Sequence, residues 1–355
     1  MKIVFSIDNK RNKFMGYESD KLGGAWYVSI KLCKELAKLG HRVYSFQNCP
    51  NEDPQGEMVD GVKVVHRKYL KDFLSKSQVD VYVGQREIPI VRKRYNIKQV
   101  YYHLHNTPMA EHPGKLLEWL KIGAIDKVIF VSQWHSDLAK KIPAHQKYVI
   151  PNGTEKLTVK GRKKKNRIIW ASNPTRGLKV LAKEIFPEVK KQIPKVELHV
   201  AGGHSIYDRT PNEANGQDKK DYSCLYDGDK LKDGMFHHGV LNQQELAQFM
   251  HDGTLLVYPL TNRSETGSII TVQSQMYLTP CIVKNECVFP ELVNVSRGMV
   301  LNNLDVNMWI TTIANMLKDN ELYKSKKDGC KKWRSKYEWK NIVKNVDKDF
   351  RGFVK

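Results

Sequence analysis

The residues best suited to chemistry lie in one short stretch of the chain's second half. Glu265 stands directly before a small, flexible step, Thr266-Gly267-Ser268, which opens an apolar run that predicts a helix. The first turn of a helix leaves backbone N–H groups without partners, and these donors favour a phosphate. Gln273 lies two helical turns beyond Glu265 on the same side. We therefore predict a nucleotide-sugar site, with pyrophosphate at the helix start, a hydroxylated group against Glu265 and a ribose near Gln273. The alternative is that Glu265 only stabilises its own helix end.

A cation is predicted to lie close to this stretch. Arg176 follows the apolar run Arg167–Ala171, which predicts a strand, and it precedes a helix that starts near Leu178. A guanidinium in such a turn can clamp a diphosphate with two hydrogen bonds. The alternative is an exposed arginine at a helix start. Arg176 and Glu265 both follow strands of the same predicted sheet, which favours the phosphate role.

Two features of the first half could face a ligand. Gly23 and Gly24 follow the first strand and open a helix, so the backbone there can approach a ligand or the facing domain, or simply form a loop. His105 and Asn106 end another strand, and the alternation of side chains sends His103 to the same side as His105. We expect His105 and Asn106 to reach a cleft; the alternative is a structural histidine beside a loop.

Short apolar runs alternate with amphipathic stretches through both halves, which predicts two doubly wound parallel sheets of the α/β class with a cleft between them. In the first half we predict strands over Ile3–Ile7, Arg42–Phe46, Val62–His66, Val79–Val83, Gln99–His103, Lys127–Ser132 and Tyr148–Ile150, and helices over Gly24–Leu39, Pro89–Tyr95, Lys115–Gly123 and His135–Lys141. In the second half we predict strands over Arg167–Ala171, Val196–Ala201, Met235–His238, Leu255–Pro259 and Cys281–Val283, and helices over Leu178–Gln192, Gln243–Asp252 and Ser268–Leu278.

Three segments interrupt or end this alternation. The basic segment Glu155–Asn166 is predicted to be the linker, and the polar segment Gly203–Lys232 a long surface loop. Helices follow Leu304, and the last is Trp339–Phe353. We therefore expect an N-terminal domain over residues 1–158, a second domain over 159–337, and a final helix, 338–355, that packs back toward the first domain.

Composition excludes several classes of protein. The chain has 355 residues, of which 41% are hydrophobic, so it is globular and not disordered. It has no apolar run long enough to span a membrane, and the apolar start is too short for a signal peptide. The six cysteines are scattered and show no zinc spacing, which favours a reduced, cytoplasmic protein with no metal. No Asp-x-Asp pair directly follows a predicted strand.

The formal net charge of +21 predicts attraction to polyanions. No nucleic-acid-binding module accompanies this charge, so we expect no specific nucleic-acid partner. We expect a peripheral, salt-sensitive contact with anionic membrane surfaces; the alternative is a basic surface with no membrane role.

Several further motifs, in their order along the chain, resemble glycosyltransferase family 4, a family of retaining enzymes with the GT-B fold. The resemblance covers most of the chain, and its motifs are Gly23-Gly24 with Leu36–Val43, Val131-Ser132, Val149–Gly153, Thr175–Leu178, Val196–Gly202, His238–Val240 with Gln244–Leu246, and Glu265 through Pro280. It implies two Rossmann-like domains with an interdomain cleft, the N-terminal one on the acceptor side and the second one binding the nucleotide sugar.

The resemblance also implies roles for single residues. Glu265 matches the family's first motif glutamate, which contacts the donor sugar, while Gln273 replaces the second glutamate, which usually holds the ribose. Arg176 matches the family's phosphate-binding lysine, Ser172 stands where the family has an arginine, and His105 matches an acceptor-side histidine. The implied donor contacts run from Thr266 through Gly267 and Ser268 to Ile269, with Gly23, Gly24 and Asn106 on the acceptor side.

The implied reaction moves a hexose or pentose from a UDP- or GDP-linked donor to a glycan, a glycolipid or another hydroxyl acceptor, with retention at the anomeric carbon. It needs no cofactor or metal, because cationic side chains and a helix N-terminus stabilise the leaving diphosphate. Two other readings stay open. The missing second glutamate and the missing first phosphate cation fit a catalytically weak nucleotide-sugar-binding protein. The fold also serves phosphorylases and epimerases that act on related sugars.

Overall fold

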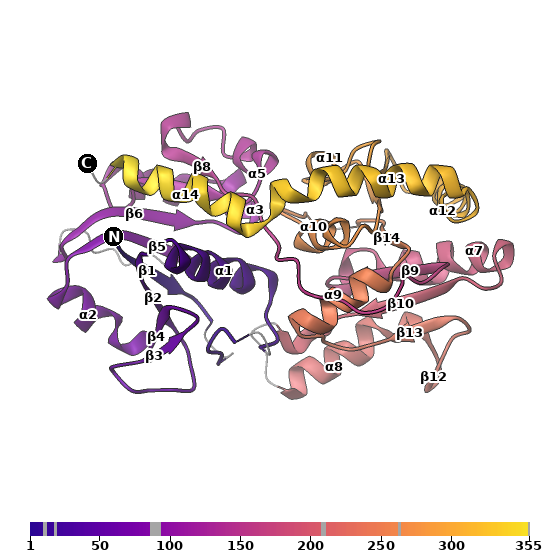
Figure 1. Ribbon diagram of the computed structural model, residues 1–355, viewed down its shortest axis with the longest axis horizontal. Coiled ribbons are helices and arrows are strands. Elements are labelled where there is room, and N and C mark those ends of the chain that lie inside the picture. The colour runs from indigo at the N-terminus through magenta and orange to yellow at the C-terminus, as the bar shows by residue number, and fades with distance from the viewer. Residues whose placement is uncertain (10–12, 18–19, 86–93, 207–210, 262–263, 354–355) are drawn as a thin grey trace. The chain divides into compact units, whose positions relative to one another are not determined.

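The computed structural model describes the chain except residues 10–12, 18–19, 86–93, 207–210, 262–263 and 354–355 (Figure 1). The described residues form two compact units. Unit 1 comprises Met1–Gly153 and Tyr337–Lys355, and unit 2 comprises Thr154–Lys336. These divisions lie within a few residues of the boundaries that the sequence indicated at 158 and 337. In the part of the chain that the structure describes, no helix has the length and apolar character needed to cross a bilayer.

Unit 1 is built on an eight-stranded sheet in the order β3-β4-β2-β1-β5-β6-β7-β8. All neighbours are parallel except β3 and β4, which pair antiparallel at one edge. The chain order reverses between β1 and β5, so this is a doubly wound sheet as predicted. The strands are β1 Lys2–Ile7, β2 Arg42–Gln47, β3 Glu57–Val59, β4 Val62–His66, β5 Val79–Gln85, β6 Ile97–His103, β7 Lys127–Phe130 and β8 Lys147–Val149.

The first helix of unit 1 ends close to a glycine, which is a local signal in the sequence. The helices of unit 1 are α1 Gly24–Lys38, α2 Leu70–Lys76, α3 Thr107–Glu111, α4 Gly114–Lys121, α5 Gln133–Leu138 and α14 Trp339–Phe353. After α1, Gly40 has a φ of +85°, which is the left-handed geometry that ends helices and favours glycine. Most of the helix predicted over Pro89–Tyr95 lies outside the described residues.

The last helix belongs to unit 1, where it packs against α1 (Figure 1). Its apolar face is buried. On the same helix, the Asp349 carboxylate accepts hydrogen bonds from the Tyr101 hydroxyl at 2.8 Å and from Lys127 Nζ at 2.9 Å. Unit 1 is therefore assembled from both ends of the chain.

Unit 2 is built on six parallel strands in the order β13-β10-β9-β14-β15-β16. In chain order this is 3-2-1-4-5-6, with the reversal between β9 and β14. The strands are β9 Arg167–Ala171, β10 Glu197–Ala201, β13 Met235–His237, β14 Leu255–Tyr258, β15 Cys281–Lys284 and β16 Gly298–Leu301. They are mostly buried apolar runs, as expected for a parallel sheet covered on both faces.

The helices of unit 2 are α6 Leu178–Val180, α7 Phe186–Gln192, α8 Pro211–Asp221, α9 Gln243–Asp252, α10 Ile269–Met276, α11 Phe289–Leu292, α12 Val306–Lys318 and α13 Asn320–Trp333. A π-helical turn, Leu181–Ile185, joins α6 to α7. Pro187 at the start of α7 lacks an N–H, so the regular ladder is interrupted just after this turn. The basic segment 155–166 lies along α9, where Lys163 Nζ donates to the carbonyls of His251 at 2.9 Å and Gly253 at 2.7 Å.

The prediction of a structureless loop over Gly203–Lys232 is wrong. This segment contains α8 and a small hairpin, β11 Tyr226–Asp227 with β12 Lys230–Leu231. We missed α8 because it is almost wholly polar and has no apolar stripe. Its remaining signals were Pro211 in the first helical position, Glu213 in the first turn, and lysines in the last turn.

Candidate functional site

The candidate donor site lies at the point where the strand order of unit 2 reverses. Parallel strands β9 and β14 are neighbours, and the segments that follow them carry Arg176 and Glu265. The two segments touch at Gly177, whose φ is +121°. A Cβ built there would lie 2.0 Å from the carbonyl oxygen of Pro259. Only a glycine allows this close approach, so the Thr175-Arg176-Gly177 turn is seated directly on the end of β14.

Glu265 receives two hydrogen-bond donors on one carboxylate oxygen. The Arg176 guanidinium forms an ion pair with Oε2, and the Tyr258 hydroxyl donates to the same oxygen at 3.2 Å. The Glu265 side chain is 12% exposed and that of Arg176 is 29% exposed. Within the described residues Oε1 accepts no hydrogen bond, so it is available to a ligand hydroxyl.

Tyr258 is a member of this site that we did not predict. It is fully buried at the end of β14, and its hydroxyl lies 2.6 Å from Ser172 Oγ. Burial raises the pKa of the phenol above its ordinary value, and the charge of Glu265 acts in the same direction, so Tyr258 stays protonated. In the sequence it looked like one more apolar residue of the Leu-Leu-Val-Tyr run.

The start of α10 lies in the same segment as Glu265. Ser268 is the N-cap and Ile269 the first helical residue, one position later than predicted. The Ser268 hydroxyl is buried and lies 2.9 Å from the hydroxyl of Thr271. Thr266 and Gly267 connect Glu265 to this helix start. The first-turn N–H groups of such a helix can bind an anion.

Gln273 lies within α10, with only 6% of its surface exposed. Its Nε2 donates to Gln243 Oε1, at the start of α9, at 3.2 Å. Its Oε1 is buried and has no hydrogen-bond partner among the described residues. A buried carbonyl oxygen without a donor is costly, so a ligand hydroxyl would be stabilising there.

In unit 1 the predicted residues gather around the ends of β5 and β6. Gly23 is the N-cap of α1 and Gly24 its first residue. The Gln85 side chain, at the end of β5, donates to the carbonyl of Ala25 at 2.8 Å and ties the start of α1 to the sheet. The Asn106 side chain caps α3 by accepting from the Met109 N–H at 3.3 Å.

The histidines of unit 1 form a group at the end of β6. The His103 and His105 rings lie 4.1 Å apart, on the same side of the chain as predicted. His105 is partly exposed and His103 fully buried. Burial lowers the pKa of His103 to about 3 and that of His135 to about 4. His135, which we did not single out, contacts the Asn106 carbonyl oxygen through Nε2 at 3.0 Å.

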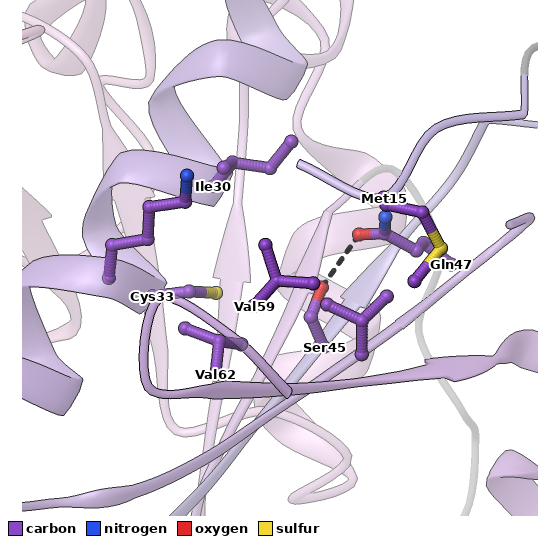
Figure 2. Close-up of a pocket in the computed structure, with 9 residues that line it drawn as sticks. Met15, Ile30, Cys33, Ser45, Gln47, Val59 and Val62 are labelled. Atoms are coloured by element: carbon purple, nitrogen blue, oxygen red, sulfur yellow. Dashed lines mark hydrogen bonds between the residues drawn. The ribbon is translucent and has the colours of Figure 1, made fainter. Parts of the chain in front are cut away.

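Two other kinds of functional site, a metal centre and an enclosed pocket, have less support among the described residues. Among the described residues, no three histidine, cysteine, aspartate or glutamate side chains could hold a metal ion together. Figure 2 shows a small pocket of unit 1 between α1 and strands β2 to β4. Its polar side chains already have partners: Ser45 donates to Gln47 at 2.8 Å, Gln47 donates to the Phe14 carbonyl at 2.6 Å, and Lys34 donates to Asp60 at 2.6 Å.

Comparison with known proteins defines the class. The sequence pattern of the family described as Glycosyl transferases group 1 matches residues 155–333, which is half of the chain. Together with the two doubly wound units, this identifies a sugar transferase of the GT-B fold. The chain belongs to the glycosyl transferases group 1 family. No functionally curated protein matches the chain.

Solved structures share the fold over almost the whole chain. Sucrose-phosphate synthase from Thermosynechococcus elongatus is 15% identical, with a TM-score of 0.74 over 99% of this chain and 98% of that one. A glycosyltransferase from Rickettsia africae is 14% identical, with a TM-score of 0.70 over 100% and 98%. HepE from Anabaena, in complex with UDP-glucose, is 14% identical, with a TM-score of 0.68 over 99% and 100%.

Proposed function

We propose that the protein is a retaining glycosyltransferase of family 4 that moves a hexose or pentose from a UDP- or GDP-linked donor to a hydroxyl acceptor. The observation that carries the proposal is the meeting of Arg176 and Glu265 at the carboxyl ends of β9 and β14, beside the start of α10. Ligands of doubly wound sheets bind at this reversal point. The UDP-glucose bound to HepE supports a nucleotide-sugar donor.

The donor would be held by four groups of unit 2. Arg176 and the α10 start, from Thr266 to Ile269, would bind the diphosphate. Glu265 Oε1 would accept a hydrogen bond from a hydroxyl of the donor sugar, and Gln273 Oε1 one from the ribose. Because the carboxylate contacts only the sugar, it should affect transfer more than nucleotide binding.

The chemistry proposed is a front-face displacement. The acceptor oxygen bonds to the anomeric carbon on the face from which the diphosphate leaves, and the sugar–phosphate bond breaks. The acceptor's proton passes to an oxygen of the leaving phosphate. Arg176 and the helix start would stabilise the developing charge without a metal. Activity should therefore survive excess EDTA, and rescue of an EDTA-inactivated protein by Mn²⁺ would contradict this step.

Unit 1 would supply the acceptor side, through His105 and the segments containing Gly23, Gly24 and Asn106. The partial exposure of His105 beside the buried His103 supports this assignment. His105→Ala should impair transfer and leave the dissociation constant of the bare diphosphate within about threefold, roughly 0.7 kcal/mol. A large loss of diphosphate affinity would instead put His105 with the nucleotide.

The function is tested by calorimetric titration with UDP, GDP, UDP-glucose and GDP-mannose, followed by product analysis with a panel of hydroxyl acceptors. Transfer with retained anomeric configuration is expected. In Glu265→Gln we expect turnover to fall by at least about tenfold, about 1.4 kcal/mol, more than diphosphate affinity changes. Wild-type turnover in this variant would remove Glu265 from the site.

A second candidate is a nucleotide-sugar-binding protein with little catalysis. It is favoured by the pairing of Arg176 with Glu265 and by a serine, Ser172, where the family has a phosphate-binding arginine. This reading predicts binding of the same nucleotide sugars without transfer or hydrolysis. The titration and the product analysis separate the two functions.

The net positive charge of the chain bears on both its cellular location and the class of its acceptor. We propose a cytoplasmic protein that contacts anionic membranes peripherally, which would suit a lipid-linked acceptor. Basic residues near an anionic leaflet contribute about 1 kcal/mol each, and salt screens them. Co-sedimentation with anionic vesicles should therefore occur at low salt and disappear at high salt. No binding at low salt would favour a glycan acceptor without a lipid.

A further inference from the structure

The site contains a chain of two hydroxyl groups, a partly buried one on Ser172 and a fully buried one on Tyr258, that ends on Glu265. Tyr258 lies 2.6 Å from Ser172 Oγ and 3.2 Å from Glu265 Oε2. A carboxylate can only accept, so in the hydrogen bond between Tyr258 and Glu265 the single proton of Tyr258 points to Glu265. The proton between the two hydroxyls must then come from Ser172. The chain therefore runs in one direction, from Ser172 to Tyr258 to Glu265.

The Tyr258 ring is held on two sides. It stacks on Trp170 with ring centres 4.6 Å apart, and it packs against Phe289 at 4.9 Å. The Tyr258 and Trp170 side chains are completely buried. A ring held in this way cannot swing its hydroxyl away, so the position of the hydroxyl oxygen beside Glu265 is set by the core and not by a flexible loop.

Arg176, the other donor to Glu265 Oε2, has a competing partner in the proposed reaction. A bound diphosphate would draw its guanidinium away from the carboxylate. Tyr258 is fully buried, and its other hydroxyl neighbour, Ser172, donates to it in this arrangement, so Tyr258 keeps its proton on Glu265. When the donor binds, Tyr258 would thus remain on Oε2 while Oε1 faces the sugar.

We propose that Tyr258, oriented by Ser172, is the positioning residue for Glu265, and that Ser172 serves this chain instead of binding the diphosphate. The proposal rests on the proposed function of Glu265 as the residue that contacts the donor sugar. It assigns a role to the serine that stands where the family has a phosphate cation. It also predicts that this serine can be replaced by threonine, which keeps the hydroxyl.

The first experiment compares kinetics and nucleotide affinity in the full chain. Tyr258→Phe should lower kcat by about tenfold or more and leave the dissociation constant of bare UDP or GDP within about twofold. Ser172→Ala should lower kcat by about threefold with the same unchanged affinity, and Ser172→Thr should restore it. The matched control is Tyr277→Phe, because Tyr277 is a largely buried tyrosine of unit 2 whose hydroxyl binds the 155–166 segment instead. It should keep wild-type kcat.

Two kinetic results would overturn the proposal. One is an unchanged kcat in Tyr258→Phe. The other is a Ser172→Ala variant that loses diphosphate affinity at unchanged kcat, which would return Ser172 to the phosphates.

A second experiment does not depend on turnover. Melting temperatures are measured for Tyr258→Phe, Glu265→Ala and the double variant. If the hydrogen bond exists, the shift in the double variant is smaller than the sum of the single shifts, because the bond can be lost only once. Additive shifts would contradict the chain even if the protein transfers no sugar. Absence of transfer with non-additive shifts would instead refute only the proposed function.

Discussion

Arg176 is the residue on which nucleotide binding should depend most. In the structure its guanidinium is paired with Glu265 and partly exposed, so a bound diphosphate can replace the Glu265 carboxylate as its anionic partner. We expect Arg176→Ala to raise the dissociation constant of UDP or GDP at least about tenfold, about 1.4 kcal/mol. Lys179→Ala is the matched control, since Lys179 is an exposed cation three residues further on. Equal affinity in the two variants, measured by calorimetry, would exclude Arg176 from the donor site.

His103 should make the stability of the protein depend on pH. Its pKa is lowered from 6.5 to about 3 by burial, and neither ring nitrogen has a hydrogen-bond partner among the described residues. The unfolded chain therefore binds a proton below about pH 6.5 that the folded chain does not bind until about pH 3. In this window the free energy of unfolding decreases as the pH is lowered, by up to about 1.4 kcal/mol per pH unit for this group.

Urea unfolding between pH 4 and 6.5 tests this expectation. As the pH is lowered, the free energy of unfolding of His103→Gln should decrease less steeply than that of the wild type. The difference in slope should correspond to the uptake of about one proton. His112→Gln serves as the control because His112 is exposed. If both variants follow the wild-type pH dependence, the buried His103 is not the group that resists protonation.

At the scale of elements, the donor site depends on how closely two segments of unit 2 approach. The Arg176 turn rests on the end of β14 through Gly177, which has a φ of +121°. Gly177→Ala combines a clash with the Pro259 carbonyl and a strained backbone, so we expect a loss of about 1–3 kcal/mol in stability and weaker diphosphate binding.

Gly216→Ala is the matched control for that substitution. Gly216 lies within α8, and a Cβ there meets nothing within 4 Å, so alanine should be neutral or stabilise the helix by about 0.5–1 kcal/mol. Thermal unfolding and UDP titration of both variants check the prediction. A Gly177→Ala variant as stable as Gly216→Ala would mean that the two segments are free to separate.

At the scale of the whole molecule, the chain leaves unit 1 at residue 153 and returns to it at residue 337. Unit 2 is continuous, whereas unit 1 needs α14, whose Trp339, Val343 and Phe350 are buried. Without α14, the largely buried Lys127 would also lose its ion pair with Asp349, and breaking a buried ion pair is costly. We expect a 154–336 fragment to fold alone and a 1–153 fragment to be unstable.

Adding a 337–355 peptide should stabilise the 1–153 fragment, measured by its melting temperature. A peptide carrying Asp349→Ala should do so less well, because it cannot pair with Lys127 or accept from Tyr101. A 1–153 fragment that melts at the same temperature with and without the peptide would contradict this division of the chain.

Much of the fold could be read from local patterns. The strands β4 and β9 and the helix α9 lie where their apolar periodicity predicted, and Arg176 and Glu265 follow strands as expected. Hydrophobic periodicity and turn-forming residues depend on positions within about ten residues of each other, so they can be recognised in the sequence without knowledge of the tertiary structure. The polar helix α8 has no such periodicity, and for that reason it was predicted as a loop.

Tertiary structure decided which of these local features meet. The sequence by itself determined that Arg176, Ser172 and Glu265 lie after strands, but only the order of the strands makes β9 and β14 neighbours. Tyr258 shows the difference most clearly. In the sequence it ends an apolar strand, and it becomes a hydrogen-bond donor to Glu265 only because the fold turns its hydroxyl toward a residue seven positions away and toward Ser172 on the neighbouring strand's end. Hydrogen bonds between distant residues depend on positions in space, which spacing along one chain does not encode.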